Sequence, residues 1–295
     1  MISLVLAACG IEEPQPSPIP NTTTIPTSTV TATPVPPTPT PTPIPLAAKV
    51  NDQGISLEEF EAELARFVVV QELESKEIPE GPELFVLYDL IDRYLLAQAA
   101  WQAGFNLGEE ELQVRITALV DAVGGEEAFN SWLVEHGYTE DSFREALLLS
   151  IASAWMRDQI LVSVPITSEQ VKARQIFTST AEQANRILDQ LQAGEDFAEL
   201  AAEYDPLLWG DLGWFPRGYL LEIELEEAAF DMEPGEHSQV IQTRLGYHIL
   251  QVIERDPDRE LEPDAYLTLQ MLAFHDWLES MREESDIQIM LPISD

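Results

Sequence analysis

The spacing of apolar residues changes along the chain, and helical spacing dominates residues 48–165. Apolar side chains there recur three and four positions apart, which places them on one face of a helix and predicts five helices. Ser56 and Glu59 form a capping box at the first helix, and residues 48–55 before it predict a short strand or turn. Glycine or proline ends the later helices, at Gly104, Gly124, Gly137 and Pro165.

From residue 166 onward, strand-like and helical patterns alternate in short segments. Apolar runs bounded by glycine predict strands, and apolar residues at helical spacing predict helices. The predicted order is β-α-α-β-α-β-β over residues 166–257. The segments are a strand at 172–177, a helix at 181–191, a helical turn or two from 197, a strand at 210–215, a helix at 225–230 and two strands within 238–252.

A final helical pattern over residues 264–283 completes the division of the chain. We therefore predict an α+β protein in which an all-helical domain precedes a smaller mixed domain. The predicted segments are a truncated signal at 1–9, a tether at 10–46, the helical domain at 47–165, the mixed domain at 166–257 and a C-terminal helical segment at 258–295.

The predicted tether is rich in proline and threonine. Residues 11–46 hold 12 of the 21 prolines and contain no Gly, Lys or Arg. Such a composition buries almost nothing, so it does not offset the entropy of ordering. Proline favours an extended polyproline II chain at ~3.1 Å per residue, which reaches roughly 100 Å over this length. The segment is therefore expected to hold a folded body away from an anchor.

Charge and cysteine content exclude several classes of protein. The chain has 15 Lys+Arg and 53 Asp+Glu, a formal net charge of −38, which repels phosphate backbones and argues against nucleic acid as a partner. No apolar run reaches the ~18–20 residues that cross a bilayer. One cysteine permits neither an internal disulfide nor a cysteine-rich metal site. The acidity itself indicates no particular function.

That single cysteine follows a short apolar run and two small residues, in Leu6-Ala7-Ala8-Cys9-Gly10. The pattern resembles the bacterial lipobox, in which the signal peptide is removed before a cysteine that receives diacylglycerol. The resemblance implies a lipid on Cys9 that attaches the protein to a membrane. No Lys or Arg precedes Cys9, and eight residues are too few for a signal peptide, so we expect its start to lie upstream of Met1.

Six short motifs in the mixed domain occur in one order. They are Ala173-Arg174-Gln175-Ile176, Gly194-Glu195-Asp196-Phe197-Ala198-Glu199-Leu200-Ala201, Gly210-Asp211-Leu212-Gly213-Trp214-Phe215, Glu227-Ala228-Ala229-Phe230, Pro234-Gly235-Glu236-His237-Ser238 and Thr243-Arg244-Leu245-Gly246-Tyr247-His248-Ile249. Together they resemble the parvulin peptidyl-prolyl cis-trans isomerases. The flanking helical segments resemble the chaperone part of the SurA and PrsA foldases. That resemblance implies that the helix at 264–283 packs back on the helical domain.

The parvulin resemblance also implies the site residues. His248 matches the second of two family histidines, Thr243 the hydroxyl, and Asp205 best matches a Cys or Asp position in a loop that is shortened here. The first histidine is replaced by Gln175, whose amide can bond His248 but cannot be protonated. The resemblance assigns the apolar wall that contacts a proline ring to Leu220 or Leu221, Leu225, Phe230 and Leu245. Amide rotation makes and breaks no covalent bond, so neither cofactor nor metal is expected.

Two further interpretations stay open beside a lipid-anchored, extracytoplasmic isomerase that assists unfolded or nascent secreted polypeptides containing X–Pro bonds. Gln175 favours a holdase chaperone whose parvulin domain has lost activity. A substrate-binding or scaffold lipoprotein is a third class. The pair Glu226-Glu227 is expected on a solvated helix face rather than as a glycosidase dyad.

Overall fold

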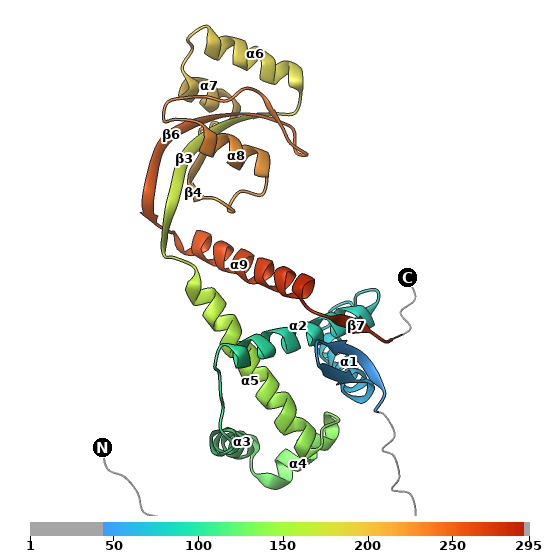
Figure 1. The fold of residues 1–295 in the computed structure, drawn as a ribbon. Helices are drawn as coiled ribbons and strands as arrows, with labels where there is room; N and C mark the ends of the chain where they lie inside the picture. The colour runs from blue at the N-terminus through green and yellow to red at the C-terminus, as the bar shows by residue number, and fades with distance from the viewer. Residues whose placement is uncertain (1–43, 292–295) are drawn as a thin grey trace, which may run out of the picture. The chain divides into compact units, whose positions relative to one another are not determined.

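The computed structural model describes residues 44–291 (Figure 1). The predicted lipidation residue Cys9 and almost all of the predicted tether lie outside this range. Within it, the five helices predicted for the first domain are present. They are α1 (Leu57–Leu73), α2 (Pro82–Gln102), α3 (Glu109–Val123), α4 (Glu126–Glu135) and α5 (Glu140–Ser163).

Local capping explains where several of these helices begin and end. The Ser56 side chain accepts a hydrogen bond from the Glu59 N–H, as the predicted cap requires. Thr139 and Ser142 satisfy each other's backbone N–H groups in a capping box at the start of α5. Gly124 ends α3 with φ at +104°, a left-handed conformation that glycine adopts without steric cost.

The first domain also contains a small sheet, of which the sequence predicted only a short strand or turn at 48–55. Strands β1 (Leu46–Val50) and β2 (Gln53–Ser56) form a hairpin, and β7 (Ile287–Ile289) pairs antiparallel with the other edge of β1. The strand order is therefore β2-β1-β7. Both ends of the described chain meet in this sheet.

The core of the helical domain is centred on α2. One group of its side chains, including Leu87, Ile91 and Leu95, is almost completely buried beside the small sheet. Farther along the helix, Ala97 and Ala100 pack with Ala152 of α5, and these small side chains allow the two helices to approach closely. The helical domain therefore has α2 as its central element.

The C-terminal helix α9 (Pro263–Glu284) packs on α2 and α5, which confirms that it returns to the helical domain. Phe274 and Trp277 join buried Leu96 and Ile160 in one cluster. Arg282 forms a two-pronged ion pair with Asp92 of α2, with Nε 2.8 Å from the carboxylate. Within residues 44–291, no helix combines the length and apolar composition needed to cross a membrane.

The second domain has the predicted order of elements. They are β3 (Thr167–Thr178), α6 (Ala181–Gln192), α7 (Phe197–Tyr204), β4 (Asp211–Pro216), α8 (Ile223–Asp231), β5 (Ile241–Gln242) and β6 (Tyr247–Glu260). The four strands form an antiparallel sheet in the order β4-β3-β6-β5. Strands β3 and β6 are its long central pair, and both extend well beyond the predicted segments.

Apolar side chains cover both faces of this sheet. Leu250 and Val252 of β6 pack with Phe215 and with the α8 side chains Leu225 and Phe230. Their neighbour Ile249 points to the opposite face, where residues of α6 and α7 cover it. Because both faces are buried, β3 and β6 hold their side chains in fixed positions.

Candidate functional site

The paired central strands bring three of the four predicted catalytic side chains together. Phe177 of β3 lies opposite His248 of β6, so Gln175 lies two residues away along the neighbouring strand. His248 Nδ1 is 2.8 Å from Gln175 Oε1, and His248 Nε2 is 3.0 Å from Thr243 Oγ1. The imidazole is thus held between an amide and a hydroxyl.

The direction of these hydrogen bonds follows from the groups involved. Gln175 presents a carbonyl oxygen, which only accepts, so His248 Nδ1 carries the proton. Nε2 then accepts from the Thr243 hydroxyl, which itself accepts from the Leu245 backbone N–H at 3.1 Å. One continuous chain of hydrogen bonds therefore joins the turn before β6 to β3.

Burial favours the neutral form of His248. The residue is only 3% exposed, and the Phe177 ring lies 5.0 Å from the imidazole centroid. Burial lowers the pKa of His248 below its ordinary value, and the nearby Glu222 carboxylate opposes that change without reversing it. A neutral ring fits the arrangement of one donated and one accepted hydrogen bond.

The turn that carries Thr243 requires glycine at position 246. Gly246 has φ at +152°, and a Cβ added there would come within 2.7 Å of both the Phe177 ring and the Thr178 carbonyl oxygen. The Thr243 N–H donates to the Gly246 carbonyl at 2.8 Å and closes the turn. This close approach sets the position of Thr243 beside the imidazole.

Asp205, the fourth predicted catalytic residue, holds the backbone of its own turn. Its carboxylate accepts hydrogen bonds from the N–H groups of Leu207, Leu208 and Gly210, at 3.1 to 3.3 Å. Within residues 44–291, no hydrogen bond joins it to His248. A catalytic role for Asp205 therefore stays a prediction, and its structural role is to shape the 205–210 turn.

The predicted apolar wall divides into buried and open side chains. Leu225 and Phe230 belong to the core, and the Arg217 guanidinium lies 4.2 Å above the Phe230 ring. Leu220 is half-buried against the same cluster. Leu221 and Leu245 are 90% and 64% exposed, so they are free to contact a bound chain.

Glu226 is a site residue that the sequence did not reveal, and the expectation of a solvated face is wrong for it. It is buried, whereas Glu227 is exposed. Its carboxylate accepts from the N–H groups of Gly218, Tyr219 and Leu220, at 2.7, 3.0 and 3.2 Å. Glu226 therefore positions the loop that carries Leu220. Three glutamates in the first turns of α8 look alike in sequence, so no local signal distinguishes it.

An ion pair connects two of the loops around the candidate site. Glu222, the buried residue before α8, accepts from Arg244 Nε at 2.7 Å. Arg244 lies between Thr243 and Leu245, so this contact joins the loop of Leu221 to the turn of Thr243. Exposed Leu207, Leu208 and Trp209 occupy the neighbouring turn, and Trp209 adopts φ of +56°, which is uncommon outside glycine.

Comparisons with known proteins identify relatives of both domains. A family model described as a PPIC-type PPIASE domain matches residues 160–254, and one described as a SurA-like N-terminal domain matches residues 36–157. Foldase protein PrsA of Halalkalibacterium halodurans is 32% identical over 232 residues, covering 70% of this chain and 69% of the relative. The chain belongs to the PrsA foldase family. Its second domain is a parvulin-type peptidyl-prolyl isomerase domain, and its first is SurA-like.

Two further relatives extend the comparison of this PrsA-family chain. Foldase protein PrsA of Caldanaerobacter subterraneus is 30% identical over 200 residues, which cover 61% of this chain and 60% of the relative. The crystal structure of peptidylprolyl isomerase (PrsA) from Bacillus cereus is 23% identical, with a TM-score of 0.43, and covers 79% of this chain and 86% of the other.

Proposed function

We propose that this chain is a membrane-tethered, extracytoplasmic foldase that isomerises X–Pro bonds in unfolded or nascent secreted polypeptides. The observation that carries the proposal is the His248 imidazole, held between Gln175 and Thr243 within a parvulin-type domain. Similarity to foldase proteins supports the wider role in protein folding.

The chemistry needed is rotation about a stiff amide bond. Resonance gives that bond a barrier of ~18–20 kcal/mol, and an X–Pro bond interconverts over tens of seconds or longer without a catalyst. An apolar surround that excludes water weakens the polar, planar form of the amide relative to the twisted one. Exposed Leu221, Leu245 and Phe177 supply apolar surface around the buried imidazole. The Gln175–His248–Thr243 chain keeps that surface in place during rotation.

A second candidate is a holdase without useful isomerase activity. Gln175 supports the holdase, because an amide cannot be protonated as a histidine can. Its carbonyl oxygen accepts a hydrogen bond from His248. The candidates differ in one measurable respect, since only the isomerase accelerates exchange in a short proline peptide.

The deciding experiment is NMR exchange of a short Ala–Pro peptide with the full chain. We expect wild type to accelerate cis–trans exchange and His248→Ala to lose most of that acceleration. His275→Ala is the matched control, because His275 is an exposed histidine on α9. A silent wild type with an active Gln175→His variant would establish the holdase instead, to be examined by suppression of client aggregation.

The tether is proposed from the lipobox-like segment and the proline-rich stretch that follows it. Expression from the natural start in a bacterial host, with metabolic labelling by a fatty acid, tests it. We expect label and membrane association in wild type, and neither in Cys9→Ala. Unlabelled, membrane-free wild type would contradict the anchor while leaving the isomerase proposal intact.

A further inference from the structure

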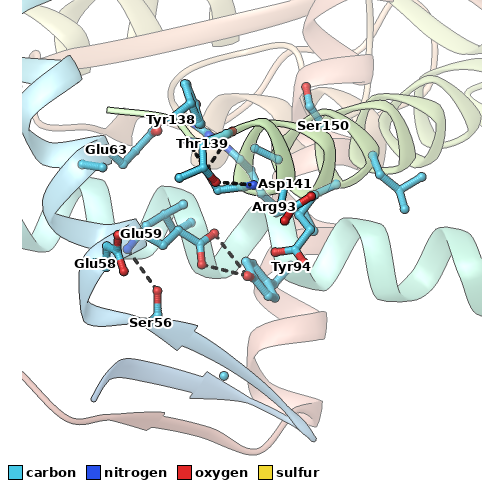
Figure 2. A pocket seen from close by; sticks show the side chains of 18 of the residues that line it. Ser56, Glu58, Glu59, Glu63, Arg93, Tyr94, Tyr138, Thr139, Asp141 and Ser150 are labelled. Atoms are coloured by element: carbon cyan, nitrogen blue, oxygen red, sulfur yellow. Dashed lines mark hydrogen bonds and ion pairs between the residues drawn. The ribbon is translucent and has the colours of Figure 1, made fainter. Parts of the chain in front are cut away.

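The helical domain contains a cavity of about 690 Å³ that is separate from the isomerase site. Its walls come from α1, α2, the first half of α5 and the residues just before α1 (Figure 2). Glu59 of α1 and Tyr94 of α2 face each other there, and Thr139 and Asp141 belong to the start of α5. A space of this size holds several side chains of a bound polypeptide.

Negatively charged side chains outnumber positively charged ones on the walls of the cavity. Five carboxylates line the cavity, from Glu58, Glu59, Glu63, Asp141 and Glu145. Two guanidinium groups line it, from Arg66 and Arg93. The formal sum is −3, so the cavity is acidic even when both arginines are counted.

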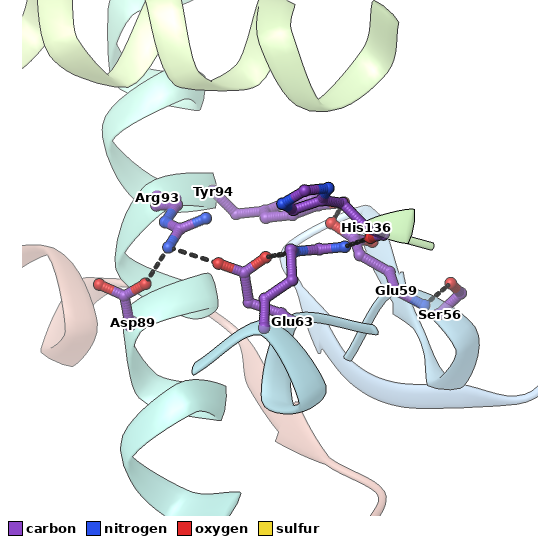
Figure 3. A network of polar contacts seen from close by, with 8 residues as sticks. Ser56, Glu59, Glu63, Asp89, Arg93, Tyr94 and His136 are labelled. Carbon is purple, nitrogen blue, oxygen red and sulfur yellow. Dashed lines mark hydrogen bonds and ion pairs between the residues drawn. The ribbon is translucent and has the colours of Figure 1, made fainter. Parts of the chain in front are cut away.

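Both arginines are already engaged with other partners, and Figure 3 shows Arg93 between Glu63 and Asp89. Arg66 Nε donates to Glu63 at 3.0 Å, and its Nη1 donates to the His136 carbonyl at 2.8 Å. Arg93 bridges Glu63, at 2.9 Å, and Asp89. Burial alone raises the pKa of Glu63, but the two arginines outweigh burial and lower it overall. Of the five cavity carboxylates, Glu63 is therefore the one whose negative charge the two arginines balance.

Glu59 has no such partner. Both of its carboxylate oxygens accept from the single Tyr94 hydroxyl, at 3.1 and 3.0 Å. Burial raises the pKa of Glu59, and the charges of Glu63 and Glu145 raise it further. Among residues 44–291, no basic side chain forms an ion pair with Glu59 or Glu145. Glu59 is half-buried, whereas Glu145 is exposed at the rim. Partial burial of a carboxylate without a cation is unfavourable, and a ligand that supplies a cation offsets this cost.

The remaining lining is suited to the stem of a long basic side chain. Leu90 and Trp101 of α2 and Leu148 and Leu149 of α5 give the cavity an apolar part beside its carboxylates. Lysine and arginine combine apolar methylene groups with a charged end, and aromatic rings attract such cations. Neither an acidic nor a wholly apolar segment complements both features.

We propose that this cavity binds a lysine or arginine side chain of an unfolded client, with its charged end against Glu59 and Glu145 and its methylene groups against Trp101 and Leu148. The inference rests on the proposed foldase function and assigns the helical domain a preference for basic segments. The chain's own N-terminal segment is not the occupant, because residues 1–43 contain no Lys or Arg.

The test measures binding of a labelled Ala-Leu-Lys-Leu-Ala peptide to the full chain by fluorescence anisotropy. Replacing lysine by norleucine removes the charge and keeps the length. We expect the lysine peptide to bind at least about tenfold more tightly, the effect of one charged hydrogen bond. Glu59→Gln and Glu145→Gln should each reduce that preference. Glu110→Gln, on the exposed face of α3, is the matched control.

Three results would overturn the inference: equal binding of both peptides, no effect of either cavity variant, or equal loss in the Glu110→Gln control. Complete displacement of the peptide by an equal concentration of spermidine would assign the site to free amines instead of clients. Exchange of the Ala–Pro peptide is measured on the same samples. Retained exchange with no lysine preference defeats this inference alone, whereas absent exchange bears on the isomerase proposal.

Discussion

At the scale of single residues, the candidate site is defined by which groups donate hydrogen bonds to His248 and which accept them. Gln175 gives His248 a fixed acceptor, and Thr243 gives it a donor. A protonated histidine at position 175 would donate to His248 instead of accepting from it, whereas the carbonyl oxygen of glutamine can only accept. The replacement therefore fixes the tautomer of His248.

The direction of the hydrogen bonds on His248 predicts how catalysis depends on pH. Burial lowers the pKa of His248 below its ordinary value of 6.5, so the neutral form of the folded ring predominates above pH 6.5. Below that value the unfolded state binds the proton more readily, so stability falls as pH falls through the lowered pKa. We expect catalysed exchange to be constant from about pH 7 to 8 and to decline as the pH falls below 6.5. NMR titration of the His248 ring beside the exchange rates checks this.

A titration midpoint for His248 above 6.5 would contradict the neutral, donor-and-acceptor arrangement. The spontaneous exchange rate of the peptide at each pH is the control, since it separates effects on the enzyme from effects on the substrate.

At the scale of elements, loops are placed by side chains from neighbouring helices and turns. The 218–220 loop has three N–H groups that no strand or helix satisfies, and Glu226 of α8 accepts all three. Asp205 does the same for the 205–210 turn. Buried Glu226 and half-buried Asp205 thus shape two of the loops around His248.

Glu226→Ala leaves these three N–H groups without an acceptor. We expect a loss of unfolding free energy of ~1–3 kcal/mol, the cost of leaving a buried polar group unsatisfied. Catalysed exchange should also fall, because Leu220 loses its fixed position. Urea denaturation and the exchange assay measure the two effects. Glu227→Ala, one residue away on the exposed face of α8, should change neither. Equal effects of the two substitutions would refute a positioning role for Glu226.

At the scale of the whole molecule, the chain returns after the isomerase domain to the helical domain and its first described strand. Helix α9 packs on α2 and α5, and β7 pairs with β1. The Asn51 side chain at the β1–β2 turn also accepts a hydrogen bond from the Asp286 N–H at 3.0 Å. The helical domain is therefore completed by residues that follow the parvulin domain, and its stability depends on both parts of the sequence.

A double-mutant cycle on Asp92 and Arg282 tests this closure. The two residues are separated by 190 positions and form a two-pronged ion pair between α2 and α9. We expect Asp92→Asn and Arg282→Gln each to destabilise the chain, with a coupling energy of about 1 kcal/mol, as for a half-exposed pair of good geometry. Thermal unfolding in low salt is the measurement. Strictly additive effects would show that the pair does not stabilise the closure.

The sequence by itself determined what depends on near neighbours along the chain. Helical spacing and the cap at Ser56 predicted the helices, and the strand-like and helical patterns that alternate after residue 166 predicted the β-α-α-β-α-β-β order. The resemblance of the 243–249 motif to the parvulins assigned Thr243 and His248 to one site, and the structure shows them joined across one short turn. These features follow from backbone geometry within a few residues.

Only the tertiary structure decided what depends on contacts between distant segments. The Gln175–His248 hydrogen bond spans 73 positions and exists because β3 and β6 pair in one register. A three-residue strand such as β7 carries too few side chains to show alternation, and its partner β1 lies at the other end of the described chain. Burial of Glu226 and exposure of Glu227 likewise depend on where α8 packs. Local patterns determine elements, and long-range packing determines which of their side chains meet.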